Sequence, residues 1–230
     1  MPNYTVKAET LQPRNRYPEA ITVVTVPERK GYLIVKRMMD IVGALCGLVI
    51  FLPVFLLVAI LIKLGDPRGS VFFKQRRIGK DGKPFEMYKF RSMVSGAEEM
   101  LERLLDRNEV DGAMFKIKDD PRITRVGRFI RRTSLDELPQ LWNVLKGDMS
   151  LVGPRPPLPR EVEMYSSHER QRLLVTPGCT GLWQVSGRNA LSFQDMVELD
   201  LYYIRNRGIL FDLKIIVKTF WVMLFPNNAF

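Results

Sequence analysis

The chain has 230 residues, enough to bury a sizeable core in one domain of ordinary size. Its formal net charge of +10 favours an anionic partner, such as nucleic acid, phosphorylated small molecules or an anionic membrane surface. Two cysteines do not make a disulfide framework, and the single histidine, His168, excludes a metal site built from several histidines. Acid–base chemistry therefore falls mainly to carboxylates, and a bound metal would take oxygen ligands, which favours Mg²⁺ or Mn²⁺.

The N-terminal part of the chain combines a polar arm with one long apolar segment. Residues 1–31 are polar with little periodicity, which predicts a flexible arm. Residues 41–62 carry no charge, and a straight helix of this length would reach roughly 33 Å, enough to cross the core of a bilayer. The segment starts too late for a cleaved signal peptide, so it predicts either a single transmembrane span or a bent membrane segment.

Two features favour the bent form. Pro53 lies in the middle of the segment and interrupts a backbone hydrogen bond there. Basic residues lie on both sides of the segment, among them Lys36, Arg37, Lys63 and Arg68. A single span would place one of these basic groups on the wrong side of the membrane, against the positive-inside tendency. We therefore expect residues 32–66 to form a re-entrant membrane helical hairpin, broken at Pro53, that enters one leaflet and returns.

A β-hairpin and an amphipathic helix are expected next. Residues 70–92 favour strands, and Asp81 with Gly82 supplies a tight turn between them. Ser95 and Glu98 then match a capping box, which predicts the start of a helix. The apolar face of that helix would hold Met100, Leu101, Leu104 and Leu105.

Three further helices are expected in the rest of the chain. Residues 122–132 predict a helix with arginines on one face and, on the other, Ile123, Val126, Phe129 and Ile130. Residues 135–147 predict a second helix that ends at Gly147 and is either distorted at its entry by Pro139 or begins near that residue. Residues 211–225 predict a third helix, and Lys214 and Lys218 on one face of it fit a position in the membrane interface, with a packed core helix as the alternative.

Two adjacent acids, Asp136 and Glu137, follow a strongly basic stretch. Between Pro121 and Leu135 there is no acid, and the stretch holds five arginines, at positions 122, 125, 128, 131 and 132. Ser134 and Glu137 match a capping box, so the two acids are explained equally by the start of a helix. Alternatively, the arginines bind a diphosphate while one acid binds Mg²⁺ and the other attacks phosphorus. The glycine-rich residues 176–189 add backbone amides that could approach a phosphate.

Five blocks in this chain together resemble the bacterial sugar transferases, the monotopic polyprenyl-phosphate phosphoglycosyl transferases. The blocks read "KRMMDIVGALCGLVIFLPVFLLVAILIKL", "YKFRSM", "RFIRRTSLDELPQLWNVLKGDMSLVGPRP", "PGCTGLWQVSGRN" and "ELDLYYIRN", and they stand in the order found in the family. The resemblance covers about residues 32–225. It implies transfer of a sugar 1-phosphate from a UDP-sugar to undecaprenyl phosphate, with release of UMP and a requirement for Mg²⁺.

The resemblance also assigns roles to individual residues. It implies that Asp136 is the nucleophile, forming a covalent aspartyl-phosphosugar intermediate, and that Glu137 binds the metal. It places in the substrate-binding set Lys89, Arg91, Arg131 and Arg155. Arg188 and Asp200 match the later blocks with less defined substrate-binding roles, and structural ion pairing is the alternative explanation for Lys89, Arg188 and Asp200.

The expected architecture is a mostly helical α+β fold. A re-entrant N-terminal membrane helix, a small β-hairpin and interfacial amphipathic helices would surround a cytoplasmic catalytic domain, residues 67–230. Longer members of the family carry extra N-terminal membrane helices, so we expect the short exopolysaccharide-type form. Many members have Ser-Pro where this chain has Leu52-Pro53, which leaves the angle of the break undefined because leucine cannot bond a freed carbonyl.

The expected partners follow from the same resemblance. They are a UDP-sugar, undecaprenyl phosphate and membrane lipid at the inner membrane of a bacterium, with no nucleic acid; a homodimer stays open. Glucose or galactose is the expected sugar, and an N-acetylated sugar remains an alternative. The competing functions are a membrane-bound phosphohydrolase that uses the same two acids, and a non-enzymatic protein that binds anionic lipid.

Overall fold

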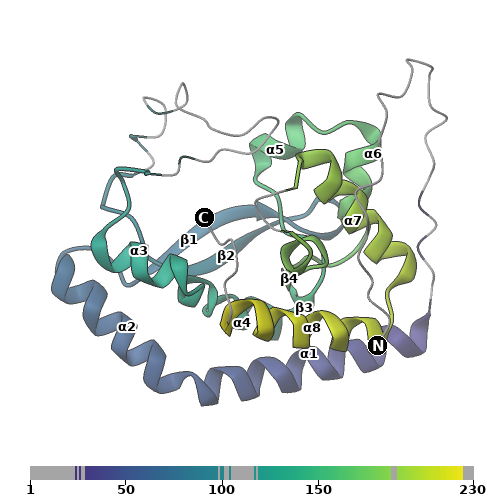
Figure 1. Ribbon diagram of the computed structural model, residues 1–230, viewed down its shortest axis with the longest axis horizontal. Coiled ribbons are helices and arrows are strands. Elements are labelled where there is room, and N and C mark those ends of the chain that lie inside the picture. Colours follow the sequence, from purple (N-terminus) through teal and green to yellow (C-terminus); the bar gives the residue numbers. More distant parts are fainter. Residues whose placement is uncertain are drawn as a thin grey trace.

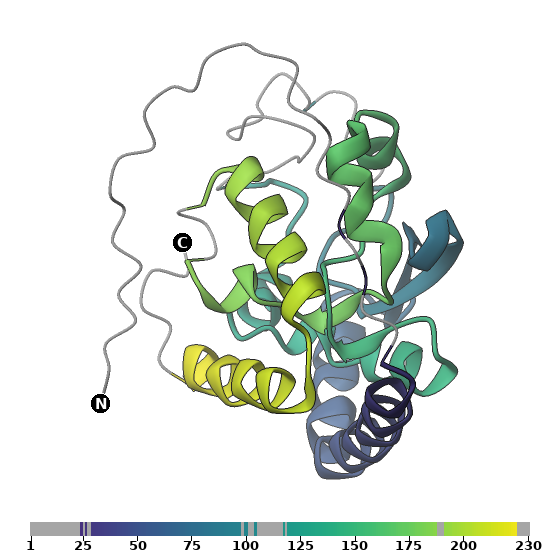
Figure 2. The ribbon, with the colours of Figure 1, turned by 90° about the vertical axis from the view of Figure 1, so that its right-hand side faces the viewer.

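The computed structural model describes residues 24, 26, 29–97, 99, 100, 104, 117, 119–187 and 191–224. This part of the chain is mostly helical, with two small two-stranded sheets, which confirms the expected α+β class. Two long helices run along one edge of the molecule, and the remaining elements are stacked on one side of them (Figure 1). The helix that ends the described chain lies beside the first of the two on the same edge (Figures 1 and 2).

The two long helices are α1, Lys30–Ile50, and α2, Leu52–Gly65. No single helix in the described ranges is long and apolar enough to cross a bilayer, but this pair together meets the requirement and is bent by 59°. The break lies at Phe51, two residues before the expected position. Pro53 instead occupies the first turn of α2, where a missing N–H breaks no helical hydrogen bond. The bend is much shallower than a hairpin that folds back on itself.

The expected β-hairpin is present. Strands β1, Phe72–Ile78, and β2, Pro84–Phe90, pair antiparallel, and Phe72 lies opposite Phe90. The connection contains the short 3₁₀ turn η1, Lys80–Gly82. Asp81 and Gly82 there have φ values of 56° and 76°, which matches the positive φ that tight hairpin turns require.

Beyond the hairpin, helix α3 spans Arg125–Arg132 and begins three residues later than expected. The side chain of Thr124 caps it by accepting a hydrogen bond from the Gly127 N–H at 2.8 Å. Ile130 is buried as expected, but Phe129 is 55% exposed. Most of the helix expected from the capping box at Ser95 lies outside the described residues, so that prediction stays open.

The two acids lie in a 3₁₀ turn, η3, Leu135–Glu137, which leads into helix α4, Gln140–Lys146. Pro139 stands immediately before α4, so the distorted entry that its ring predicts is observed. Gly147 ends the helix with a φ of 92°, a left-handed conformation that glycine adopts without strain. The chain then enters β3, Ser150–Val152, which pairs in parallel with β4, Gly178–Thr180.

Short elements connect these strands to two longer C-terminal helices. The short ones are α5, Pro159–Glu163, α6, Ser167–Arg170, η4, Gln171–Leu174, and η5, Trp183–Val185. The long ones are α7, Phe193–Asn206, and α8, Ile209–Leu224. The main core cluster joins α7 and α8 to β3 and includes Val152, Leu201, Tyr203 and Ile215. Val24, from the segment expected to be a flexible arm, also packs in this cluster.

Helices α1, α2 and α8 leave a large apolar surface exposed. Its residues include Ile34, Met38, Val49, Leu56, Leu64, Leu210, Val217 and Trp221, each at least 56% exposed. A continuous apolar surface of this kind in a monomer indicates contact with a membrane or a partner. On α8, Lys214 and Lys218 are also exposed and line the same shallow surface depression as Leu210 and Trp221, as expected of a helix in the membrane interface.

Candidate active site

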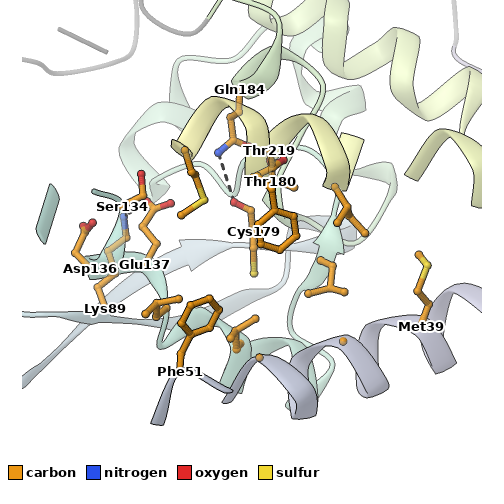
Figure 3. Close-up of a pocket in the computed structure, with 18 of the residues that line it drawn as sticks. Met39, Phe51, Lys89, Ser134, Asp136, Glu137, Cys179, Thr180, Gln184 and Thr219 are labelled. Carbon is orange, nitrogen blue, oxygen red and sulfur yellow. Dashed lines mark hydrogen bonds and ion pairs between the residues drawn. The ribbon is translucent and has the colours of Figure 1, made fainter. Parts of the chain in front are cut away.

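A pocket of about 750 Å³ lies between α1, α8 and the turn that holds the two acids. Asp136, Glu137, Lys89 and Ser134 gather at one end of it, and Met39 lies at the other end (Figure 3). Apolar side chains of α1 and α8 line much of the space between, including Val42, Phe51, Ile216, Phe220 and Met223. The pocket therefore joins a polar end to an apolar floor built from the helices with exposed apolar surface.

The turn at the polar end is not an ordinary start of a helix. Ser134 has a φ of 56° and its side chain makes no capping hydrogen bond. The carboxylate of Glu137 accepts a hydrogen bond from Lys89 Nζ at 2.6 Å instead of folding back on the backbone. The capping box that could explain both acids therefore does not form, and the strained Ser134 conformation turns Asp136 toward the pocket.

The pKa values of the two carboxyl groups are shifted in opposite directions. Asp136 is 7% exposed, and its burial, together with the neighbouring Glu137, raises its pKa to about 6, although Lys89 and Arg131 oppose this shift. For Glu137, burial also opposes ionisation, but Lys89 outweighs it and holds the pKa of this carboxyl below its usual range. A buried carboxylate with a raised pKa beside an ion-paired one is typical of sites where two acids have different roles.

The structure brings only some of the expected site residues together. Lys89 and Arg131 line the pocket with the two acids. Arg155 lies outside the lining and contacts Glu161 at 3.4 Å, although its charge lowers the pKa of Glu137. Arg91 forms an ion pair with Asp66 at 3.1 Å and so ties the end of β2 to the end of α2.

Two other expected residues are not placed at the pocket. Asp200 is fully buried and forms an ion pair with Arg172 at 2.7 Å, so its position matches the structural alternative. Arg188 lies outside the described residues.

The arginine-rich stretch does not converge on the pocket. Of its five arginines, only Arg131 lines it. Arg122 precedes α3 and is buried against Asp120, with the two charged groups 2.6 Å apart. The structure therefore does not bring these arginines to the pocket as a group, because the helical period directs them around α3 and Arg122 has its own acid.

One glycine of the loop between Thr176 and Asn189, Gly178, has a structural role together with Gly153. The Gly178 N–H donates to Pro154 O at 2.8 Å, and the Gly153 N–H donates to Thr180 O at 2.9 Å. A Cβ atom on Gly153 would lie 2.6 Å from Thr176 O. These glycines let the β3 and β4 segments approach closely, and the two amides are not available to a phosphate.

Side chains from the same loop line the pocket, and the sequence did not single them out. Thr180 Oγ1 and Thr219 Oγ1 are 2.8 Å apart, which links β4 to α8 across the pocket wall. Trp183 also lines the pocket; it is 8% exposed, and its buried Nε1 has no hydrogen-bond partner among the residues that the structure describes. A buried indole N–H usually finds an acceptor, so the N–H without a partner distinguishes Trp183 in the structure.

The pattern of the whole chain identifies its family. The model of the bacterial sugar transferase family matches residues 31–226. The chain belongs to this family. It is 50% identical over 202 residues to the galactosyl transferase CpsE of Streptococcus agalactiae serotype III, which covers 86% of this chain and 44% of that protein. It is 46% identical over 199 residues to the undecaprenyl-phosphate galactose phosphotransferase of Salmonella typhimurium. This match covers 85% of this chain and 41% of that protein.

The exopolysaccharide production protein ExoY of Sinorhizobium fredii is similar in length to this chain. The two are 42% identical over 209 residues, which covers 87% of this chain and 92% of that protein. The chain thus spans less than half the length of CpsE and the Salmonella transferase, and most of the length of ExoY.

The acids of this sugar transferase fit a magnesium ion only in part. Among the described residues there is no group of three or more side chains able to ligate a metal. Mg²⁺ is commonly held by one or two carboxylates, with substrate phosphate oxygens and waters completing its shell. Asp136 and Glu137 fit that limited role, and the ion would depend on the phosphates of a bound substrate.

Proposed function

We propose that this chain transfers a sugar 1-phosphate from a UDP-sugar to undecaprenyl phosphate and releases UMP. The observation that carries the proposal is buried Asp136 at the polar end of a pocket whose floor is apolar. A soluble nucleotide-sugar and a lipid-linked phosphate can meet only where a polar site borders the membrane. The resulting lipid-linked sugar would be the first membrane intermediate of exopolysaccharide, capsule or O-antigen synthesis.

The names of similar proteins support galactose as the first sugar to test. CpsE is named a galactosyl transferase, and the Salmonella and Erwinia amylovora relatives are named for galactose and a lipid carrier. A relative from Aeromonas hydrophila, 41% identical, is named for N-acetylgalactosamine, so the N-acetylated sugar remains the second candidate.

In the first step, an Asp136 carboxylate oxygen attacks the phosphorus that carries the sugar. The P–O–P bond of the UDP-sugar breaks, UMP leaves with the bridging oxygen, and the phosphosugar becomes an acyl phosphate on Asp136. A pKa of about 6 leaves Asp136 mostly ionised at neutral pH, and its burial means that little water has to be removed from the nucleophile.

In the second step, a phosphate oxygen of undecaprenyl phosphate attacks the same phosphorus. Its bond to Asp136 breaks, the carboxylate is restored and the sugar leaves on a lipid diphosphate. The apolar floor of the pocket, including Phe51 and Phe220, would hold the first part of the prenyl chain. One phosphoanhydride replaces another, so the overall reaction is nearly balanced in energy.

The remaining polar residues of the pocket would bind the metal ion and stabilise the negative charge of the phosphates. Mg²⁺, when bound, would offset the negative charge on the diphosphate oxygens. Glu137 would bind it, and Lys89, now 2.6 Å from Glu137, lies where it can contact a phosphate oxygen once that carboxylate has another cation. Arg131 adds a second positive group at the same end.

The bent helix pair supports a re-entrant membrane position. Neither α1 nor α2 alone is a span, and the basic groups at both ends fit the same, cytoplasmic, side of the bacterial inner membrane. Arg91, paired with Asp66, then fixes the returning end of α2 to the catalytic domain.

The decisive experiment measures UMP release by the purified chain in nanodiscs with Mg²⁺, undecaprenyl phosphate and a panel of UDP-sugars. We expect UDP-galactose to give lipid-dependent turnover that Asp136→Asn abolishes. Equal UMP release with water as the sole acceptor would favour the phosphohydrolase instead. Asp136→Asn as active as the wild type would remove Asp136 as nucleophile and favour the lipid-binding alternative.

A further inference from the structure

A second, smaller pocket lies against the N-terminal half of α1, and neither of the two acids lines it. Its volume is about 130 Å³, and it shares no lining residue with the candidate active site. The N-terminal half of α1, the loop after α4 and the end of α7 form its walls. Its charged lining residues are Lys36, Arg37, Arg207 and Asp40.

The cations of this pocket differ in how they are held. Lys36 Nζ lies 3.0 Å from the carboxylate of Asp212. The guanidinium of Arg37 donates to Val144 O at 2.6 Å and Leu145 O at 2.8 Å, which uses its donors without neutralising its charge. Asp40 accepts hydrogen bonds from Ser150 Oγ and the Leu151 N–H, both at 2.9 Å. Three cations therefore meet two acids, Asp40 and Asp212.

Arg207 is the unusual member of the group. It is 9% exposed, its buried Nε has no hydrogen-bond partner, and no ion pair within the described ranges includes it. Its guanidinium lies over the ring of Tyr32, 5.6 Å from the centroid, so the ring contacts one face and leaves the in-plane N–H groups available. A buried Nε–H without a partner is costly, because no hydrogen bond replaces the water that it loses.

We propose that this pocket binds one phosphate group through Arg207, at a site separate from the candidate active site. The excess positive charge and the planar set of free donors match the oxygens of a phosphate. The pocket volume of about 130 Å³ is well above the roughly 10–15 Å³ that a single water needs, and it leaves room for a phosphate group.

The headgroup of an anionic membrane lipid is the source that the surroundings favour. Leu33 lines the pocket and is 43% exposed, and the adjacent Ile34 on α1 is 64% exposed. Leu210, three residues after Arg207, is 76% exposed. An acyl chain could therefore lie on the apolar surface while its phosphate reaches Arg207, and the bound lipid would hold α1 against the junction of α7 and α8.

The test compares lipid binding by the full chain in detergent. Phosphatidylglycerol, zwitterionic phosphatidylcholine and inorganic phosphate are titrated separately, and bound lipid is counted by native mass spectrometry while the thermal unfolding midpoint is followed. Arg207→Gln removes the proposed ligand group. Arg205→Gln is the matched control, since Arg205 lies in the last turn of α7, two residues before Arg207, carries the same charge and is exposed.

We expect phosphatidylglycerol to bind the wild type and Arg205→Gln equally, and Arg207→Gln about tenfold or more weakly, as for loss of a charged hydrogen bond. Equal phosphatidylglycerol affinity of Arg207→Gln and Arg205→Gln would overturn the site. Equal affinity for phosphatidylcholine and phosphatidylglycerol would overturn the anionic lipid as its source. If inorganic phosphate gives the same Arg207-dependent shift and displaces the lipid, the site stands and its source is soluble phosphate.

A folding failure of Arg207→Gln is covered by a second pair, Arg207→Lys and Arg205→Lys. Lysine keeps the charge but loses the planar fork. A phosphatidylglycerol affinity of Arg207→Lys that is lower than that of the wild type supports the site. An affinity equal to that of Arg205→Lys contradicts it.

Discussion

Asp136 and Glu137 are neighbours in the chain, but the turn between them gives each a different environment. Asp136 is buried, and this burial raises its pKa to about 6 although Lys89 and Arg131 oppose the shift. Glu137 contacts Lys89 at 2.6 Å, so its pKa falls despite burial. The strained Ser134, with a φ of 56°, produces this separation because it prevents a regular helical start. The two acids are thus prepared for the separate roles that the proposed reaction requires.

The raised pKa of Asp136 predicts the pH dependence of the first step. The nucleophile must be ionised, and its ionised form is lost as the pH falls through about 6. We expect kcat/KM for UMP release to be level above pH 7 and to fall about tenfold per pH unit below about 5.5. A profile that stays level down to pH 4.5 would contradict the assignment of Asp136.

Lys89 is expected to matter far more than another lysine of the same hairpin. Lys89→Met leaves Glu137 without its cation and removes a phosphate contact, so we expect kcat/KM to fall about a hundredfold or more. The matched control is Lys74→Met, because Lys74 pairs with Glu86 at 3.1 Å at a site where both side chains are more than half exposed. Such surface pairs contribute about 0–1 kcal/mol. Similar losses in the two variants would contradict a role for Lys89 in the pocket.

At the scale of elements, one buried acid joins α1, α7 and α8. Asp212 is fully buried and accepts hydrogen bonds from Tyr32 Oη at 2.9 Å, Lys36 Nζ at 3.0 Å and Tyr203 Oη at 2.8 Å. These contacts bring α8 against α1 and so form two walls of the large pocket. Helices α1 and α8 are therefore fixed relative to each other by polar contacts as well as by apolar packing.

Breaking this contact should destabilise the whole domain. Lys36→Met leaves Asp212 buried without its cation, and we expect the free energy of unfolding to fall by about 3–5 kcal/mol. Thermal unfolding in detergent measures the loss, with Lys74→Met as the exposed control. A loss below 1 kcal/mol in Lys36→Met would show that the Asp212 contact does not hold α1 and α8 together.

At the scale of the whole molecule, α1, α2 and α8 lie along one edge (Figures 1 and 2), and each of them carries exposed apolar residues. The candidate active site opens beside this edge, between α1 and α8. If that edge enters one leaflet, the reacting phosphates meet at the membrane surface, where an anionic lipid substrate presents its headgroup.

A re-entrant position makes a prediction that a single span does not. Lys30→Cys and Arg68→Cys lie at the two ends of the helix pair and are exposed. In a background without native cysteines, we expect a membrane-impermeant maleimide to label both from the cytoplasmic side only. Labelling of the two positions from opposite sides of the membrane would show that the pair crosses the bilayer.

Local signals in the sequence predicted much of the fold. Asp81-Gly82 predicted the hairpin turn and Gly147 the end of α4, because each needs only a local backbone conformation. Pro53 predicted that the apolar segment bends, but not that the break lies at Phe51, since a proline is tolerated inside the first helical turn. The network around Asp212 could not be predicted, because its partners lie as far as 180 positions apart.

The candidate site was predicted only where one short motif holds its residues. Asp136 and Glu137 stand together in the sequence and line the pocket together with Lys89 and Arg131. Asp200 matched a later block with a less defined role, and only the structure shows that it forms an ion pair with Arg172. Thr180 and Thr219 were missed because their contact joins a loop to a helix 39 positions later.

The most direct test of the account is a single turnover without the lipid acceptor. The chain is mixed with UDP-galactose and Mg²⁺ in the absence of undecaprenyl phosphate, and UMP and protein mass are followed together. We predict release of up to one equivalent of UMP and a phosphogalactose adduct on the peptide that contains Asp136, both absent from Asp136→Asn. With that sugar shown to be the substrate in lipid-dependent turnover, UMP release only when undecaprenyl phosphate is present, with no adduct, would contradict a covalent intermediate on Asp136.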